Sequence, residues 1–311
     1  MSEAAKMFPI VSVPPDAAEL SEQMGTKFKF WYLDAQRRRT LFKEGRPGTG
    51  ENWAEKIAAE LAELLGIPHA HYDLAEWNGR NGIISPSLVK KGDRLIHGNE
   101  LIEGKVTVAR GDENLRYYEQ RSHIASRAFQ LLKKNADIIA PPQGYLPGNG
   151  VDSALGVFVG YLLFDAWIAN QDRHSENWGV VSSGGQLFLS ASYDHGSGLA
   201  RNETDERRKI MLSTKDKGAS LEAYANRARS AFYPHAAGDA KVKAYFTHVL
   251  FQLSHKEDER AGDMWIERLA SIADADIADI INQVPGQLMT DVAREFTAKL
   301  LRININRLIV R

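Results

Sequence analysis

Trp167-Ile-Ala-Asn-Gln-Asp-Arg-His-Ser-Glu-Asn-Trp178, followed further along the chain by Asp194-His-Gly196, is the stretch of sequence that decides the expected fold. It places Asp172, Asn177 and Asp194 in the order in which a phosphoryl-transfer site uses these residue types. Asp172 would receive the proton of an attacking hydroxyl. Asn177 and Asp194 would hold magnesium, because this hard cation prefers oxygen ligands. The pattern therefore predicts an ATP-dependent kinase.

The sequence around this motif predicts a buried helix, a polar loop and a hairpin, in that order. Residues 154–169 are almost continuously apolar, and the run is too long for a strand. Asp165 interrupts the run, whose uncharged part is shorter than the roughly 20 residues that cross a bilayer. Residues 178–181 and 186–189 resemble two short strands around the turn 182–185. Such a hairpin would carry the catalytic loop at one end and the metal-binding Asp at the other.

A kinase also needs a strand lysine for the nucleotide phosphates and a helix glutamate that holds this lysine. Residues 27–33 and 39–44 resemble strands, and Lys43 lies at the end of the second one. Apolar residues at helical spacing predict a helix over 52–65. Glu55 borders the apolar face near the start of this helix, so we expect it to be the partner of Lys43. The competing carboxylates, most of which we expect to be solvated, are Glu51, Glu60 and Glu63.

Several motifs together carry a family resemblance. They are Gly25-Thr-Lys, Leu41-Phe-Lys-Glu44, Ala54-Glu-Lys-Ile-Ala-Ala-Glu60, Gly82-Ile-Ile-Ser85 and Asn170-Gln-Asp-Arg-His174 with Asn177. In this combination the chain resembles the HipA-like serine/threonine kinases of bacteria, over roughly residues 25–200. The last motif is also similar to the catalytic loop of phosphatidylinositol 3- and 4-kinases.

This resemblance implies an α+β, two-lobed, protein-kinase-like fold. The small β-rich N-lobe would contain one main helix, and the larger C-lobe would be mostly helical. The implied division is a lead-in over residues 1–24, an N-lobe over 25–104 and a C-lobe over 105–311. Helical patterns in the C-lobe are expected over residues 119–135, 221–232, 241–253, 264–275 and 289–308.

The resemblance also implies roles for individual residues. Lys43 would pair with the phosphates of ATP, and Asp172 would act as the catalytic base. Asn177 and Asp194 would bind Mg²⁺, and His174 would shape the catalytic loop. The acceptor would be a serine or threonine hydroxyl of a protein substrate.

The phosphate-binding loop and a protein partner are two further expectations. No Gly-x-Gly-x-x-Gly precedes Lys43, so the loops whose amides could cradle phosphate are 24–26, with Gly25 and Thr26, and 45–50. For 45–50 a plain strand-to-helix connection is equally expected. A small antitoxin-type protein is a possible partner. Lys43 lies too early for the extra N-terminal subdomain of full-length HipA toxins, so arrangements that need this subdomain are not expected.

The composition is that of an ordinary globular protein, with 311 residues, 43% hydrophobic and 25% charged. A net charge of −1 gives no electrostatic footprint for nucleic acid. The absence of cysteine excludes disulfides, thiolate catalysis and cysteine-rich zinc sites. The N-terminal residues lead into no long apolar segment, so we expect a cytoplasmic protein. No basic membrane-facing helix or lipidation signal is visible, so a protein acceptor is favoured over a lipid.

Two alternatives use the same residues differently. A metal-dependent phosphohydrolase could use Asp172, His174, Asn177 and Asp194 together with His195, but this leaves Lys43 and its helix unexplained. A catalytically inactive, nucleotide-binding interaction protein is the second alternative.

Overall fold

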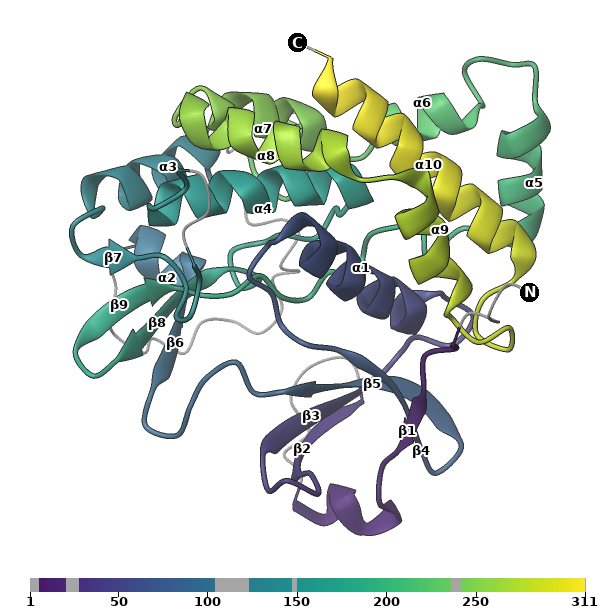
Figure 1. Cartoon of the computed structure of the whole chain (residues 1–311), viewed down its shortest axis with the longest axis horizontal. Coiled ribbons are helices and arrows are strands. Elements are labelled where there is room, and N and C mark those ends of the chain that lie inside the picture. Colours follow the sequence, from purple (N-terminus) through teal and green to yellow (C-terminus); the bar gives the residue numbers. More distant parts are fainter. Residues whose placement is uncertain (1–5, 21–27, 104–122, 147–149, 236–241, 311) are drawn as a thin grey trace. The chain divides into compact units, whose positions relative to one another are not determined.

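The computed structural model describes residues 6–20, 28–103, 123–146, 150–235 and 242–310 (Figure 1). The chain divides into two compact units, and neither is a single continuous segment. The first comprises Met1–Leu88, His195–Ala225 and Ile272–Ile303, and the second comprises Val89–Asp194, Asn226–Ser271 and Asn304–Arg311. The chain therefore passes from the second unit into the first between Asp194 and His195.

The first unit contains a five-stranded sheet in the order β1-β4-β5-β3-β2. Its strands are β1 (Ile10–Ser12), β2 (Lys29–Leu33), β3 (Arg39–Glu44), β4 (Asp73–Trp77) and β5 (Arg80–Pro86). β1 pairs parallel with β4, and the other neighbours are antiparallel. β2 and β3 confirm the strands predicted over residues 27–33 and 39–44. β1, followed by the 3-10 helix η1 (Pro15–Leu20), has only three residues, which is too few for a periodic signal.

The turn between β4 and β5 fixes the register of these two strands. Trp77 is paired with Arg80, which leaves Asn78 and Gly79 as the two turn residues, with φ values of 49° and 76°. Positive φ at both central positions is the requirement of a type I′ turn, which Asn-Gly meets best. In the separate pairing of β5 with β3, Gly82 lies opposite Glu44, and a Cβ added there would lie 2.5 Å from the carbonyl oxygen of Lys43.

Helix α1 (Glu51–Leu65) contacts β4 and β5 of this sheet and is drawn beside them in Figure 1. Its apolar side chains, such as Ile57 and Leu61, are fully buried. Gly66 ends the helix in the left-handed conformation at φ 79°, as glycine does most easily. The predicted helix over 52–65 is therefore confirmed, and β3 and α1 are the two elements that carry Lys43 and its acidic neighbours.

The second unit is built around helix α4 (Ala154–Ile168), all of whose residues are buried. Ser153 begins the helix, and its hydroxyl accepts a hydrogen bond from the Gly156 amide at 2.9 Å. α4 contacts α7 (Thr247–His255) and α8 (Glu259–Ser271). The glycine at position 160 lets the Trp265 ring lie against α4, because an added Cβ would lie 2.4 Å from it.

A four-stranded sheet in the order β6-β8-β9-β7 completes the second unit. β8 (Gly179–Ser183) and β9 (Gln186–Leu189) form the predicted hairpin around Gly184 and Gly185, which have φ values of 57° and 84°. The elements not yet given are β6 (Arg94–His97), α2 (Gly98–Glu103), α3 (Ala125–Lys134), β7 (Ile139–Ala140), α5 (Asp205–Ser213), α6 (Leu221–Asn226), α9 (Asp274–Asn282) and α10 (Asp291–Ile309).

Several helices have other bounds than their sequence patterns indicate. α3 begins at Ala125, with residues 119–122 outside the described part of the chain, α7 begins at Thr247 instead of residue 241, and α8 covers Glu259–Ser271 instead of 264–275.

The largest difference at a C-terminal helix end is that of α6. The pattern predicts a helix over 221–232, whereas α6 ends at Asn226. The residues after α6 are extended, because the Ser230 amide bonds to the Tyr245 carbonyl at 2.8 Å and the Tyr245 amide bonds to the Phe232 carbonyl at 2.9 Å. Backbone pairing with a distant segment therefore replaces local helix formation here, as tertiary context often does.

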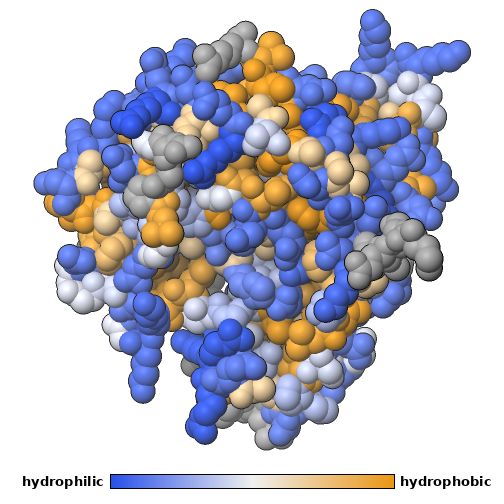
Figure 2. Space-filling view, viewed as in Figure 1, coloured by the Kyte–Doolittle hydropathy of each residue, from blue (hydrophilic) through white to orange (hydrophobic). Residues whose placement is uncertain are grey.

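The visible surface is mostly polar. Hydrophilic residues cover much of the face drawn in Figure 2, and apolar atoms appear between them. The described residues include no helix that is long and apolar enough to cross a membrane.

Candidate functional site

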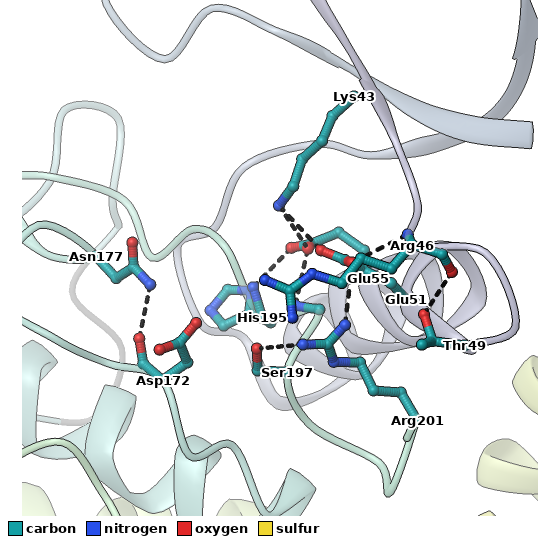
Figure 3. A network of polar contacts seen from close by, with 11 residues as sticks. Lys43, Arg46, Thr49, Glu51, Glu55, Asp172, Asn177, His195, Ser197 and Arg201 are labelled. Carbon is teal, nitrogen blue, oxygen red and sulfur yellow. Dashed lines mark hydrogen bonds and ion pairs between the residues drawn. The ribbon is translucent and has the colours of Figure 1, made fainter. Parts of the chain in front are cut away.

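Lys43 lies at the end of β3, and two carboxylates of α1 are its neighbours (Figure 3). Its Nζ is 3.6 Å from Oε1 of Glu51 and 4.0 Å from Oε2 of Glu55. Both glutamates are buried, with exposed fractions of 3% and 1%. The sequence singles out Glu55 as the partner, but Glu51 lies closer. A burial of this depth requires that each carboxylate be matched by positive charge or by hydrogen-bond donors.

Glu55 is matched mainly by backbone donors. The amides of His195 and Gly196 donate to its two oxygens at 2.6 and 2.8 Å. Glycine is needed at position 196, because an added Cβ would lie 2.5 Å from Oε2 of Glu55. The carboxylate therefore anchors the peptide that follows Asp194 directly, and this contact has no sequence signal.

Glu51 is matched by a second cation. Nη1 of Arg201 donates to Oε2 of Glu51 at 3.0 Å, and Nη2 donates to the Ser197 hydroxyl at 3.1 Å. Lys43, Arg201 and the two glutamates therefore form a network of two positive and two negative charges (Figure 3). Sequence reasoning missed Arg201 and Ser197, because they belong to no motif and lie far from Glu51 in the chain.

Glu55→Gln tests this anchor. The amide of glutamine has one acceptor oxygen, so one of the two backbone amides of His195 and Gly196 would face an NH₂ group. A buried donor that loses its partner costs about 1–3 kcal/mol, and we expect the free energy of unfolding to fall by that amount. Urea unfolding measures it. Glu63→Gln, at an exposed position of the same helix, is the matched control and should change stability by less than about 0.5 kcal/mol. Equal effects of the two substitutions would contradict the anchor.

In the second unit, the loop after α4 brings Asp172, His174 and Asn177 together (Figure 3 shows the Asp172–Asn177 bond). The carbonyl of Asp172 accepts from the side-chain amide of Asn177 at 2.6 Å and from the backbone amide of His174 at 2.8 Å. The backbone amide of Asn177 donates to the His174 carbonyl at 2.9 Å. The three residues therefore form one compact turn, in which the Asp172 side chain is half-buried.

Side chains on either side brace this turn. Nδ1 of His174 accepts from the Glu176 amide at 3.1 Å, which fits the expected role of His174 in shaping the loop. The Asn170 side chain accepts from the Asp172 amide at 3.2 Å and donates to Asp165 at 2.9 Å. Hydrogen bonds of Asn170 and His174 therefore hold the loop on both sides of Asp172, the expected base.

Arg173 and Asp165 form a buried ion pair beneath the loop. Nε and Nη2 of Arg173 bond to the two oxygens of Asp165, the second at 2.8 Å. The exposed fractions of the residues are 1% and 3%. The sequence does not predict this ion pair, because Asp165 is recognised there only as a charged residue within an apolar run and Arg173 only as part of the catalytic-loop motif. Their pairing needs the left-handed turn at Ala169 (φ 54°), which ends α4 and returns the chain past Asp165.

Asp194 has an unusual backbone for a residue with a Cβ, with φ of 57°. Left-handed conformations cost energy in all residues except glycine, and Asp and Asn tolerate them best. Such conformations are concentrated at functional sites.

His123 is buried behind the same loop. Its Nε2 accepts from the Trp178 indole at 2.9 Å, and its Nδ1 lies 3.0 Å from the Ala231 carbonyl, to which it donates. One ring nitrogen accepts and the other donates, so the imidazole is neutral. Burial lowers the pKa of His123 to about 3.

This pKa predicts how stability depends on pH. The folded-state pKa lies below the ordinary value of 6.5, so the unfolded chain binds an extra proton between these values. The free energy of unfolding should therefore fall below about pH 6.5, by up to about 1.4 kcal/mol per pH unit. In His123→Gln this contribution to the pH dependence of the free energy of unfolding should be absent. Urea unfolding of both proteins between about pH 7 and pH 5 measures the difference. His248, whose pKa burial also lowers, is present in both proteins and cancels in the difference. An unchanged slope would contradict a neutral buried His123.

Of the two expected phosphate-binding loops, the one over residues 45–50 lies within the described part of the chain. Gly25 and Thr26 lie outside the described residues. The loop over 45–50 turns at Gly48, with φ of 74°, and the Thr49 hydroxyl donates to the Arg46 carbonyl at 2.8 Å. It borders a cavity of about 210 Å³ together with Trp53 and Arg201.

The oxygen donors of the second unit suit magnesium. The Nδ2 group of Asn177 is engaged with Asp172, which leaves its amide oxygen as the atom that would meet a cation. The carboxylate of Asp194 would be the second ligand in the expected site. Across the described ranges, no group of three or more His, Cys, Asp or Glu side chains is placed to hold a metal ion. A site formed by Asn177, Asp194 and nucleotide oxygens does not need such a group.

Solved structures of other proteins are similar to this chain, and two of them are informative. The proinflammatory kinase CtkA of Helicobacter pylori is similar with a TM-score of 0.67 and 16% identity, over 97% of this chain and 99% of that one. HipA of Shewanella oneidensis MR-1, from a toxin–antitoxin complex with HipB and operator DNA, has a TM-score of 0.51 and 11% identity, over 92% of this chain and 64% of that one. No family model and no curated protein sequence matches. The chain therefore has the α+β, kinase-like fold of CtkA and HipA, which is the fold that its resemblance to HipA-like kinases predicts.

Proposed function

We propose that this protein is an ATP- and magnesium-dependent kinase that phosphorylates serine or threonine hydroxyls of a protein. The observation that carries the proposal is the loop of the second unit, in which Asp172 and Asn177 are joined by a 2.6 Å hydrogen bond. This spacing of a base and an amide ligand is the one found in the catalytic loop of protein kinases. The similarity to the kinase CtkA, which extends over almost the full length of both chains, supports the proposal.

The residues of the site have separate roles in the proposed reaction. Asp172 orients the acceptor hydroxyl and takes its proton. Lys43, kept in place by Glu51 and Glu55, neutralises charge on the nucleotide phosphates. Asn177 and Asp194 are the residues that would hold magnesium, which when bound neutralises the charge that develops on the phosphates. Positioning and electrostatics contribute most of the rate, because this chemistry needs little covalent participation by the protein.

The similarity to HipA supports an antitoxin-type protein as a partner. HipA is found in complex with HipB, so a small protein of that kind is a candidate partner for this chain as well. The chain spans 64% of the length of that HipA, so this partner rests on a partial match.

The test is a titration of the purified protein with a non-hydrolysable ATP analogue, with and without Mg²⁺, followed by transfer from γ-labelled ATP to candidate proteins. Magnesium-dependent binding and labelled serine or threonine are expected. Binding without transfer would favour the inactive, nucleotide-binding alternative. Release of inorganic phosphate from phosphorylated compounds without nucleotide binding would favour a phosphohydrolase.

A further inference from the structure

Arg173 makes contacts that reach beyond its ion pair. We propose that it is a positioning residue that sets the separation and orientation of the two magnesium ligands, Asn177 and Asp194. This inference rests on the proposed kinase function. It assigns Arg173 no contact with substrate.

The guanidinium joins three separate segments of the second unit. It bonds to Asp165 at the end of α4, its Nη1 donates to the Asn177 carbonyl at 3.1 Å, and its Nη2 donates to the Ser192 hydroxyl at 2.9 Å. Asn177 is one proposed ligand, and Ser192 lies two residues before the other. One side chain therefore braces both ligands against the same buried carboxylate.

A second bridge supports the same geometry. The Tyr193 hydroxyl donates to the Glu176 carbonyl at 2.7 Å. Glu176 and Tyr193 immediately precede Asn177 and Asp194, so the two segments that carry the ligands are bonded directly to each other and are also bridged by Arg173. The left-handed backbone of Asp194, with φ of 57°, must be held by its surroundings, and these bonds supply part of that restraint.

The chemistry of the site requires arginine. Arg173 uses its Nε, Nη1 and Nη2 in a plane, and a lysine ammonium cannot reach three segments with one nitrogen. Arg173→Lys keeps the charge beside Asp165, so the buried carboxylate retains a counterion. The substitution therefore loosens the ligands while sparing the ion pair, whereas Arg173→Ala would leave Asp165 unpaired and risks unfolding.

The experiment measures the Mg²⁺ concentration that gives half-maximal binding of the ATP analogue. In Arg173→Lys this concentration should rise about tenfold or more, as for other residues that orient metal ligands, while binding without Mg²⁺ stays unchanged. Ser192→Ala, which removes one of the bonds and fills no new space, should shift it in the same direction by a smaller factor. Arg207→Lys, at a side chain that is 67% exposed, is the matched control and should leave it unchanged.

A wild-type magnesium requirement in a folded Arg173→Lys protein would overturn the inference. If that variant does not fold, Ser192→Ala decides, and an unchanged requirement there overturns it too. A merely structural role would lower the melting temperature without moving the magnesium requirement. Failure of the kinase proposal itself is visible separately, since the wild-type protein would then show no magnesium-dependent nucleotide binding.

Discussion

Asp172→Asn is expected to abolish nearly all phosphate transfer and to leave nucleotide binding unchanged. Asparagine has nearly the same shape as aspartate and can keep the backbone contacts of the loop, but it cannot take the proton of the acceptor hydroxyl. Loss of a general base typically lowers the rate by about 10²- to 10⁴-fold. The rate is measured with γ-labelled ATP, and binding is measured by titration with the ATP analogue.

The matched control for this substitution is Asp137→Asn. Asp137 is an exposed residue of the same unit and should tolerate the change without effect on rate. Transfer at the wild-type rate in Asp172→Asn would remove Asp172 as the base. A loss of both binding and transfer would indicate that the loop has been disturbed, because the base should not contribute to nucleotide affinity.

Asp194→Ala has the second large effect, on the magnesium-dependent part of nucleotide binding. We expect the affinity in the presence of Mg²⁺ to fall by more than the roughly 10- to 100-fold that supporting residues of metal sites contribute. The affinity without Mg²⁺ should not change. Isothermal titration with and without the cation separates the two quantities.

The backbone of Asp194 requires a second variant. Alanine is disfavoured at a φ of 57°, so part of the effect of Asp194→Ala could come from strain. Asparagine tolerates this conformation and keeps one oxygen, but it lacks the charge. Asp194→Asn should therefore retain the wild-type stability and still lose most of the magnesium dependence. Unchanged affinity for the magnesium complex in both variants would eliminate Asp194 as a ligand.

Local sequence patterns were sufficient for much of the fold. The apolar run of α4, the Asn78-Gly79 turn and the helical spacing of α1 each have a signal within a few residues. The similarity to CtkA at only 16% identity indicates that the fold is shared although most of the sequence differs. The turn that joins Asp172 and Asn177 is equally local, so the motif could place both residues in one loop.

The remaining part of the site depends on contacts between distant residues. Glu51 and Arg201 are 150 positions apart, and Glu55 lies 140 positions before the His195 amide that it accepts from. The preference for Glu55 as the partner of Lys43 rested on helix spacing alone, which cannot show that backbone amides occupy that carboxylate. The roles of Asp172 and Asp194 are predictions that the variants above test.

The hydrogen bond between Trp178 and His123 gives the protein an internal optical reporter. The Trp178 indole is 1% exposed, and its residue follows Asn177 directly in the chain. The chain contains six tryptophans, so replacing the other five by phenylalanine would leave one emission signal at the end of the loop. Fluorescence of a single indole could then follow movements of that loop in real time, with no label attached.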